Sequence, residues 1–210
     1  METDVEEKLK TGKFLPVMED FYTVQGEGHH TGSSAYFIRI GGCDVGCHWC
    51  DVKESWNADL HPLTNIEEVI SRAKAFPSRT VVLTGGEPTS YQLSKLTDCL
   101  HGAGFAIHLE SAGSYELTGN FDWICISPKK TAPPLPAISA MADELKIIVY
   151  NKNDLKWAVD QAASVSKDCL LYLQPEWGKR DEIMPLIIDF VKENPKWRIS
   201  LQSHKYMRIP

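Results

Sequence analysis

Three cysteines lie within eight residues of one another in this chain, and their spacing points to chemistry. Cys43, Cys47 and Cys50 follow the pattern C-x3-C-x2-C. Thiolates bind soft metal centres, above all zinc ions and iron–sulfur clusters. A structural zinc ion needs four ligands. The fourth would be His48, whose place next to Cys47 makes joint ligation awkward, or a remote residue such as His61. A four-iron cluster held by three thiolates instead leaves one iron open to a substrate or cofactor.

The remaining three cysteines, Cys99, Cys125 and Cys169, are scattered along the chain. We expect them to be small core residues, on one helix and two strands. The first ten residues, METDVEEKLK, are acidic and lack the apolar stretch of a signal peptide. This indicates a cytoplasmic protein. In that reducing setting disulfides are disfavoured, and a tight cysteine cluster indicates a metal or catalytic site.

Length and charge limit the class of protein. The chain has 210 residues, with 22 Lys and Arg against 28 Asp and Glu, and a formal net charge of −6. We expect a polar N-terminal tail over residues 1–13 and a single domain over residues 14–210, because this length suits one sizeable core. The acidic balance gives no global field that would attract nucleic acid or an anionic membrane. Apolar runs stay well short of the roughly 18 residues of a membrane span, so we expect neither kind of partner.

Strand-like and helix-like segments alternate after the tail. The strand candidates are residues 35–40, 80–84, 105–109, 123–126, 145–149, 169–173 and 197–201. The helix candidates are residues 64–76, 92–102, 154–163 and 181–191. Thr64 is the expected N-cap of the first helix, because Glu67 completes the spacing of a capping box.

The continuous apolar character of these strands predicts a parallel sheet covered on both faces. Two connections lack a full helix, because residues 111–122 are too few and residues 128–142 contain four prolines. A complete eightfold barrel needs about 250 residues. The expected fold class is therefore α/β, a reduced and partly open parallel β/α barrel.

Polar motifs follow six of the expected strands. They are the cysteine loop, TGGEP at 84–88, ES at 110–111, SPK at 127–129, QPEW at 174–177 and QSHK at 202–205. The carboxyl ends of parallel strands meet at one rim, which is where α/β folds place their active sites. One polar turn carries little information, but six on one rim indicate a shared site.

Two of these motifs together resemble the radical S-adenosylmethionine (SAM) superfamily. The cysteine spacing, with the aromatic Trp49 before the third cysteine, matches its signature, and TGGEP matches its glycine-rich motif. The resemblance implies a barrel of that type and a [4Fe-4S] cluster bound by the three cysteines. It also implies that Gly86 lets the backbone approach the methionine end of bound SAM.

Within that superfamily the chain resembles the 7-carboxy-7-deazaguanine synthases. It shares FYTVQGEG at 21–28, SPK, QPEW and a C-terminal Q-x-H-K-x4-P, over roughly residues 14–210. The resemblance implies a lyase that converts 6-carboxy-5,6,7,8-tetrahydropterin to 7-carboxy-7-deazaguanine with release of ammonia, in queuosine and 7-deazapurine biosynthesis. A radical derived from SAM would take a hydrogen atom from C6 of the pterin, while the protein positions and shields the reactants. The resemblance also implies a homodimer and a reductant such as flavodoxin or ferredoxin.

The same resemblance implies roles for individual residues. Its SAM-binding segments match Trp49, Cys50, Asp51, Gly86, Ser127, Pro128, Lys129, Gln174, Pro175, Glu176 and Trp177. Its substrate-binding positions match Val24, Gln25, Gly26, Glu27, Arg39, Thr84, Glu110 and Pro210, the last through its terminal carboxylate. Arg39 suits a substrate carboxylate, which a guanidinium binds through two parallel hydrogen bonds, and Glu27 and Glu110 suit N–H groups. Arg39 could instead form a surface salt bridge, and Glu27 and Glu110 could each be a cap or a salt-bridge partner.

One position departs from the family pattern. Family members carry threonine after the Cys-Asp pair, where its hydroxyl helps to bind a magnesium ion, whereas this chain has Val52. Valine offers no oxygen to a hard cation. Either other groups hold the ion, such as the substrate, water, Glu54 or Asp51, or a cation such as Lys53 replaces its charge. The hypothesis is that the magnesium requirement is relaxed.

Two alternatives remain open at this point. Another small radical SAM enzyme, such as a glycyl-radical-enzyme activase, would share the cysteine and TGGEP motifs but not the QGEG segment, Arg39 and the C-terminal proline. A protein of a different class, a zinc-stabilised binding module without catalysis, would share only the cysteines.

Overall fold

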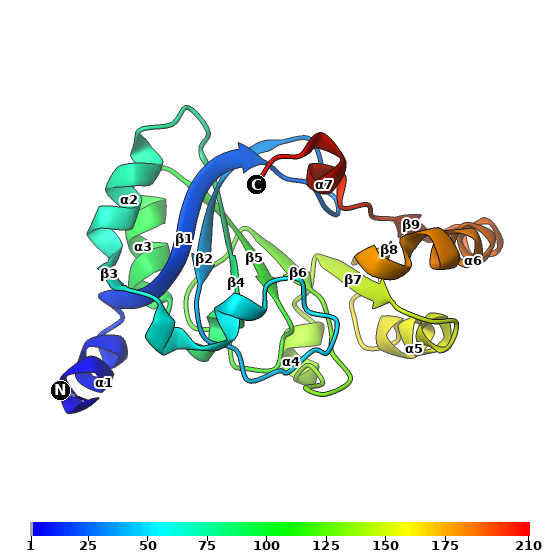
Figure 1. Ribbon diagram of the computed structural model, residues 1–210, viewed down its shortest axis with the longest axis horizontal. Coiled ribbons are helices and arrows are strands. Elements are labelled where there is room, and N and C mark those ends of the chain that lie inside the picture. Colours follow the sequence, from blue (N-terminus) through cyan, green and yellow to red (C-terminus); the bar gives the residue numbers. More distant parts are fainter. Residues whose placement is uncertain (1) are drawn as a thin grey trace.

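A curved sheet of nine strands organises the described part of the chain, and its two edges do not meet (Figure 1). The computed structural model describes residues 2–210. Its strands are β1 (Phe14–Val24), β2 (Ser34–Ile40), β3 (Leu63–Asn65), β4 (Thr80–Gly85), β5 (Ala106–Ser111), β6 (Trp123–Ile126), β7 (Glu144–Val149), β8 (Leu170–Pro175) and β9 (Trp197–Ile199).

The strands lie in the order β3-β1-β2-β4-β5-β6-β7-β8-β9. From β2 to β9 each strand runs parallel to its neighbour. At the other edge β1 is antiparallel to both β2 and β3. The expected α/β class, with a partly open parallel barrel, is confirmed.

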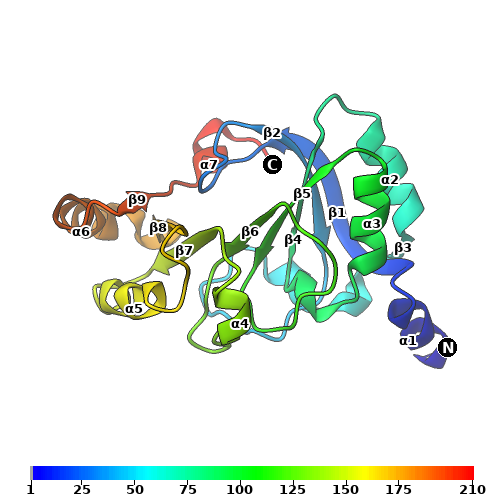
Figure 2. The same cartoon turned by 180° about the vertical axis from the view of Figure 1, so that it is seen from behind.

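Helices cover the outer face of this sheet, as the view from behind shows (Figure 2). The helices on this face are α2 (Ile66–Lys74), α3 (Ser94–Gly102), α4 (Pro136–Ser139), α5 (Asn153–Ala162) and α6 (Arg180–Glu193). Of the other two, α1 (Glu2–Lys10) lies beyond one end of the sheet, and α7 (Ser203–Met207) lies on its open side. Short 3-10 helices span Lys53–Trp56, Ala58–Leu60, Pro88–Ser90 and Trp177–Lys179. Within residues 2–210, every helix is too short or too polar to cross a membrane.

The two faces of the sheet differ in chemistry. Successive side chains of a strand point to opposite faces, and one set from each strand packs under the helices in the main core. In β2 this set is Tyr36, Ile38 and Ile40, and in β7 it is Leu145, Ile147 and Val149. The prediction of apolar strands therefore holds for the outer face.

The inner face is apolar over only part of its length. Ala35, Phe37 and Val82 form a small separate cluster there, with Phe21 packed against it. Polar side chains occupy the same face farther along the strands, at Arg39, Thr84, Glu110, Lys146 and Gln174. The inner face thus supplies polar groups where the strands end.

The long strand β1 was not expected from the sequence. Its pattern is interrupted by Pro16 and by the adjacent acids Glu19 and Asp20. Both acids find partners in the fold, because Glu19 accepts a hydrogen bond from Arg39 Nε at 2.7 Å and Asp20 accepts one from Arg72 Nε at 3.0 Å. Two adjacent acidic residues are unusual in a strand, but here each one is paired with an arginine from another part of the chain. The short strand β3, which pairs with β1, was also not expected.

The first predicted helix begins two residues later and has a different cap. Asn65 Oδ1 accepts a hydrogen bond from Glu67 N at 2.9 Å at the start of α2. Thr64, the expected cap, pairs with Leu15 in the β3–β1 ladder. Its place in a strand makes it unavailable for capping, so the capping-box prediction is wrong. The helix buries one apolar face, formed by Ile66, Val69, Ile70 and Ala73.

Two regions expected to lack helices contain short ones. Residues 2–10 form α1, within the segment 1–13 that was expected to be a tail, and Met1 lies outside the described residues. The proline-rich connection 128–142 contains α4, a single turn that begins at Pro136, where proline is tolerated because its missing N–H has no helical partner.

The isolated cysteines only partly follow the expectation. Cys125 and Cys169 are buried, whereas Cys99 is exposed. It lies on α3 as predicted, but that helix buries Leu96 and Leu100, and Cys99 falls outside their stripe. Cys99 is therefore a surface residue of this fold.

Candidate active site

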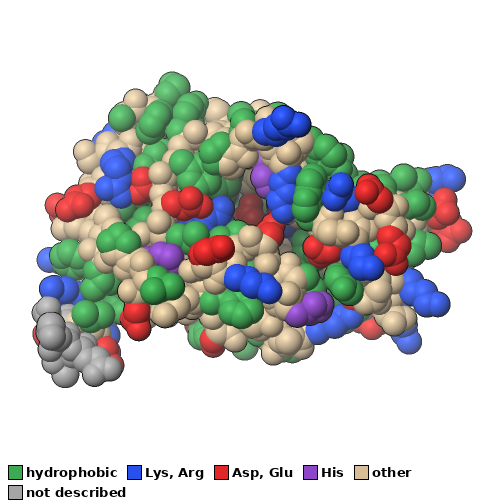
Figure 3. All heavy atoms as spheres, viewed as in Figure 1, with side chains coloured by type: hydrophobic (Ala, Val, Ile, Leu, Met, Phe, Trp, Pro, Cys, Tyr) green, Lys and Arg blue, Asp and Glu red, His purple; other side chains and the backbone are tan. Residues whose placement is uncertain are grey.

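A cavity of about 400 Å³ opens at the carboxyl ends of the parallel strands. All six polar motifs contribute to its wall, from the cysteine loop to the QSHK motif at the start of α7. The space-filling view shows a hollow near the centre of this face, with acidic and basic side chains around it (Figure 3). The predicted convergence of these motifs on one rim is confirmed.

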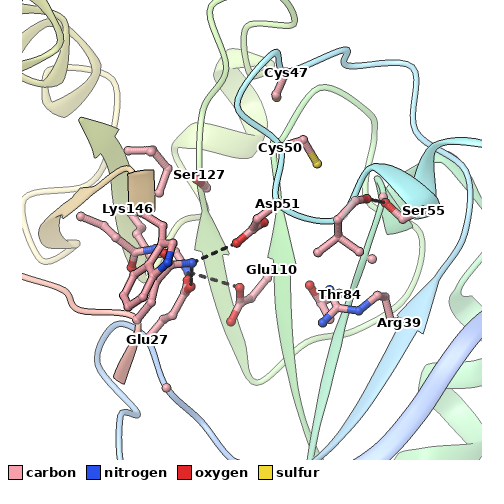
Figure 4. A pocket seen from close by; sticks show the side chains of 18 of the residues that line it. Glu27, Arg39, Cys47, Cys50, Asp51, Ser55, Thr84, Glu110, Ser127 and Lys146 are labelled. Atoms are coloured by element: carbon pink, nitrogen blue, oxygen red, sulfur yellow. Dashed lines mark hydrogen bonds and ion pairs between the residues drawn. The ribbon is translucent and has the colours of Figure 1, made fainter. Parts of the chain in front are cut away.

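The structure places the predicted site residues along this one cavity, with a single exception. Pro128 is buried and does not line it. Glu27 and Lys146 lie on one side of the cavity and Arg39 and Thr84 on the other, with Cys50 beyond them (Figure 4). The predicted residues that line it are Val24, Gln25, Gly26, Glu27, Arg39, Cys43, Cys47, Trp49, Cys50, Asp51, Thr84, Gly86, Glu110, Ser127, Lys129, Gln174, Pro175, Glu176, Trp177 and Pro210.

The glycine-rich turn after β4 packs directly on the cysteine loop. Gly86 N donates to Ile40 O at 2.9 Å, and Glu87 N donates to Gly42 O at 2.9 Å. A Cβ atom on Gly86 would lie 2.2 Å from Gly42 O and 2.7 Å from Cys43 Cβ. Glycine is thus required here for the two motifs to fit together, and its expected approach to SAM stays a prediction.

Glu87 ties this turn to the end of β5. It is 1% exposed, and its Oε1 accepts from Thr89 N at 3.1 Å, Thr89 Oγ1 at 2.6 Å and Ser111 Oγ at 2.7 Å. Its Oε2 accepts from Ala112 N at 2.7 Å. Four donors therefore converge on one buried carboxylate, which holds the loops after β4 and β5 in place.

Replacing Glu87 by Gln is expected to loosen this arrangement. The amide turns one oxygen into an N–H₂ group that faces donors, and a hydrogen bond to a charged group contributes about 1.5–3 kcal/mol. We expect the melting temperature to fall by roughly 5–10 °C, measured by anaerobic thermal unfolding. The matched control is Glu116→Gln at an exposed glutamate, which should leave the melting temperature within about 2 °C. Equal melting temperatures for the two variants would contradict this role of Glu87.

The three thiols of the cysteine loop are partly buried in the cavity wall. Burial raises the pKa of Cys43 and Cys47, while the backbone N–H groups of Val45 and Gly46 act in the opposite sense on Cys43, and Lys129 does so on Cys47. Such donors stabilise a thiolate, which is the form that binds metal. The loop therefore fits an iron–sulfur cluster held by three thiolates.

The same loop does not fit a four-ligand zinc site. In the part of the chain that the structure describes, no three His, Cys, Asp or Glu side chains are arranged to hold a single metal ion. His61 Nε2 is hydrogen-bonded to Glu54 O at 2.9 Å, and His48 packs edge-on against Tyr150, with ring centroids 5.1 Å apart. A cluster makes a different demand, because its iron atoms hold the ligands apart.

Several residues that the family resemblance assigns to SAM binding are held in place by other residues of the protein. Lys129 Nζ donates to Ser127 Oγ at 2.8 Å and lies 5.7 Å from the ring centroid of Trp49. Burial lowers the pKa of Lys129. On β8, Gln174 Oε1 accepts from Ser200 Oγ at 2.6 Å. These contacts give the cavity wall a defined shape before a cofactor binds.

The substrate-side residues are joined by a lysine that was not expected from the sequence. Gln25 Nε2 donates to Glu110 Oε1 at 2.8 Å, and Lys146 Nζ contacts Glu27 and lies 3.2 Å from Glu110 Oε2. Burial would raise the pKa of Glu27, but the charge and hydrogen bond of Lys146, with help from Gln202, lower it to about 2. A lysine inside the predicted strand 145–149, whose other residues are apolar, was the available signal, because lysine is rarely buried without a partner.

Arg39 combines the two roles considered for it. Its Nε donates to Glu19, and its side chain is 19% exposed and lines the cavity. Among the described residues none accepts from its two terminal nitrogens. Those nitrogens remain available for a ligand carboxylate on the side of the cavity opposite Glu27 (Figure 4).

The C-terminal segment is tied to the cysteine and QGEG loops. Lys205 Nζ donates to Asp51 Oδ2 at 2.7 Å, and a Cβ atom on Gly26 would lie 2.2 Å from His204 Nδ1. Burial would raise the pKa of Asp51, but Lys205 and its hydrogen bond lower it. Pro210 follows at the cavity wall, so residue 210 is held at the cavity as the sequence indicated. Gln202, His204 and Lys205 line the cavity without having been assigned a role.

Val52 lies along the cavity, and its side chain offers no oxygen. The nearby hydroxyl of Ser55 also lines the cavity and donates to Val52 O at 2.7 Å, which leaves its lone pairs free. Lys53 and Glu54 are exposed and do not line the cavity. Asp51 is occupied by Lys205. The suggested roles of Lys53 and Glu54 are therefore not supported, and the relaxed magnesium requirement stays a hypothesis.

Comparison with known proteins gives the same result as the site. Residues 37–127 match the Radical SAM superfamily. The chain is 52% identical over 207 residues to the 7-carboxy-7-deazaguanine synthase of Flavobacterium psychrophilum, covering 99% of this chain and 98% of that one. It is 42% identical to the enzyme of the same name from Synechocystis, over 92% of this chain and 93% of that one. The crystal structure of QueE from Escherichia coli superposes with a TM-score of 0.82 at 31% identity, over 93% of this chain and 97% of that chain. The chain therefore belongs to the 7-carboxy-7-deazaguanine synthase family of radical SAM enzymes.

Proposed function

We propose that this protein converts 6-carboxy-5,6,7,8-tetrahydropterin to 7-carboxy-7-deazaguanine with release of ammonia, on the route to queuosine and other 7-deazapurines. The observation that carries the proposal is the placement of Arg39 opposite Glu27 and Glu110 in the cavity that the three cysteines also line. A pterin with a carboxylate at one end and N–H groups at the other would match this distribution of charge.

The residues of the chain would bind and orient the substrate. The terminal nitrogens of Arg39 would pair with its carboxylate. Glu27 and Glu110 would accept hydrogen bonds from its amino and ring N–H groups, with Thr84, Gln25 and the segment at Pro210 completing the wall. Such orientation contributes to catalysis because the reacting atoms are already placed when reaction begins.

Cys43, Cys47 and Cys50 would hold the cluster, and the segments at 127–129 and 174–177 would hold SAM beside it. When bound, these groups supply one-electron chemistry that removes a hydrogen atom from an unactivated C–H bond. Phe21 and Phe37, whose stacked rings lie 5.5 Å apart and line the cavity, exclude water from one side of the site. A dry wall protects a reactive species from side reactions.

The proposal is tested by anaerobic turnover of reconstituted protein. We expect 7-carboxy-7-deazaguanine, identified by mass spectrometry, from 6-carboxy-5,6,7,8-tetrahydropterin, SAM and a reductant. A protein that loads a cluster and reduces SAM but leaves the pterin unchanged would overturn the proposal. That result would favour another small radical SAM enzyme.

We also propose that the magnesium requirement is relaxed, because position 52 lacks an oxygen donor. Turnover in EDTA is expected to remain within about threefold of turnover with Mg²⁺. Val52→Thr, which restores the hydroxyl, is the matched variant and should gain a stronger dependence on the ion. If wild-type activity is lost in EDTA and only Mg²⁺ restores it, the ion is held by other groups and this part of the proposal is wrong.

The proposal further includes a homodimer and a flavodoxin or ferredoxin as reductant. Both rest on membership of the family. Sedimentation of the reconstituted protein and turnover with each reductant in place of dithionite are the corresponding measurements.

A further inference from the structure

Lys146 lies between two carboxylates that come from distant parts of the chain. It projects from β7, its side chain is 5% exposed, and its Nζ contacts Glu27 from the loop after β1 and lies 3.2 Å from Glu110 at the end of β5. Figure 4 shows the three side chains at the edge of the cavity. The side chains of Glu27 and Glu110 are 15% and 24% exposed. One buried ammonium group thus joins three separate elements.

The second oxygen of each carboxylate is also fixed. Glu27 Oε1 accepts from Gln202 Nε2 at 3.0 Å, and Glu110 Oε1 accepts from Gln25 Nε2 at 2.8 Å. A carboxylate offers about four lone-pair positions, so each can still accept hydrogen bonds from a ligand. The geometry leaves two carboxylates with fixed orientation and free lone pairs.

The charges in this group do not balance. Two carboxylates surround one ammonium group, which leaves one negative charge at the cavity wall. Without the ammonium group, the buried Glu27 would lose the charge that lowers its pKa, and burial would raise that pKa. A protonated Glu27 would present a donor where the unprotonated carboxylate presents an acceptor.

We propose that Lys146 is a positioning residue that holds Glu27 and Glu110 as two fixed acceptors for the N–H groups of an amino-pyrimidinone edge of the substrate. This inference rests on the proposed function. Lys146 would act on substrate binding indirectly, by holding the carboxylates of Glu27 and Glu110 in place. A substrate that binds the two carboxylates must therefore have a ring edge with adjacent N–H donors and no negative charge.

The other ionisable groups around this set are unable to replace the ammonium group. Glu144 and Cys125 add no positive charge, and the ammonium group of Lys205 is already bound to Asp51. The ammonium group of Lys129 is held by Ser127 Oγ at 2.8 Å. Burial lowers the pKa of His204 and of His108, the last to about 4, which disfavours a positive charge on each histidine. Removing Lys146 therefore leaves the burial of Glu27 without its main opposing charge. The pKa of Glu27 then rises, and Glu27 loses its charge as the pH falls.

The test is Lys146→Met in the reconstituted holoenzyme, measured at pH 6.5 and pH 8.5. We expect KM for the pterin to rise about 10- to 100-fold at pH 6.5, which matches the loss of one hydrogen bond to a charged group, and by clearly less at pH 8.5. The value of kcat should change less than KM. The matched control is Lys130→Met, which removes a lysine paired with the buried Asp154 outside the cavity and should leave KM unchanged at both pH values.

A second variant separates positioning from folding. Lys146→Met/Glu110→Gln removes one charge of each sign and leaves Glu27 with no carboxylate beside it in this group. We expect a raised KM that still depends on pH, because Glu27 remains buried without its opposing charge. A wild-type KM in this double variant would overturn the proposal, and so would a KM in Lys146→Met that is raised equally at both pH values.

A readout without substrate distinguishes this inference from the proposed function. In Lys146→Met, infrared spectroscopy should show the carbonyl stretch of a protonated carboxyl group at pH 6.5 that is lost at pH 8.5, and the wild type should not show it. If the wild type does not turn over the pterin but this band appears, the proposed function fails and the role of Lys146 stands. If turnover is normal but no band appears, the role of Lys146 fails alone.

Discussion

Replacing Cys43, Cys47 or Cys50 by serine is expected to remove the cluster and lower turnover at least about 1,000-fold, because three thiolates are the minimum that can hold it while leaving one iron open. Each serine replaces a soft thiolate by a hard hydroxyl that remains protonated at neutral pH. Reconstituted wild type should contain about four irons per chain and absorb near 400 nm, whereas each variant should lose most of this absorbance. Iron analysis and anaerobic turnover are the two measurements.

Cys99→Ser is the matched control for these variants. Cys99 is exposed, lies on α3 and does not line the cavity. Its iron content and turnover should equal those of wild type. Full iron loading in any one of the three loop variants would show that the ligand set differs from the one proposed here.

Gly86→Ala is expected to have the second largest effect. The added Cβ would lie 2.2 Å from Gly42 O and 2.7 Å from Cys43 Cβ. Both neighbours belong to the backbone or base of the cysteine loop, so relief requires the loop itself to move. We expect a destabilisation of about 3 kcal/mol, a fall in melting temperature of roughly 6–12 °C, and turnover reduced by at least about 100-fold because the cysteine loop is displaced.

Gly102→Ala makes the same chemical change without a collision. Gly102 is the last residue of α3, and a Cβ atom there would meet nothing within 4 Å. Because alanine loses less conformational entropy in a helix, the melting temperature should stay the same or rise slightly. The melting temperature and the turnover of both variants are compared with those of the wild type. If Gly86→Ala retains wild-type turnover, the close contact between the two motifs is not essential.

Comparison of expected and observed elements shows where sequence reasoning succeeds. All seven expected strands are present. The strands of a parallel sheet are buried, so each one appears in the sequence as a continuous apolar run. The errors lie where a tertiary partner changed the outcome. β1 contains Glu19 and Asp20, which became acceptable in a strand only when Arg39 and Arg72 were placed beside them. Thr64 does not cap the helix because it pairs with β1 in the β1–β3 ladder.

In the candidate site, too, local motifs were predicted correctly and contacts between distant residues were not. The motifs identified which loops belong together, and the cavity contains residues from each of them. Lys146 has no motif, and its importance depends on Glu27 and Glu110, which lie 119 and 36 positions away in the chain. An ion pair between distant positions leaves no local pattern. The same reason explains why the hydrogen bonds of Gln202 to Glu27 and of Lys205 to Asp51 were not expected.

The parallel strands, the family and the loops that form the site could all be predicted from the sequence, because each depends on residue type and local order. The folded chain was needed to show which charges neutralise one another, which glycines are required for packing and which face of each strand is polar. Gly86 is required because Gly42 O lies where its Cβ would be. Glu27 is ionised because β7 brings Lys146 beside it. These properties depend on distances of a few ångströms between remote residues, which are set only when the sheet is assembled.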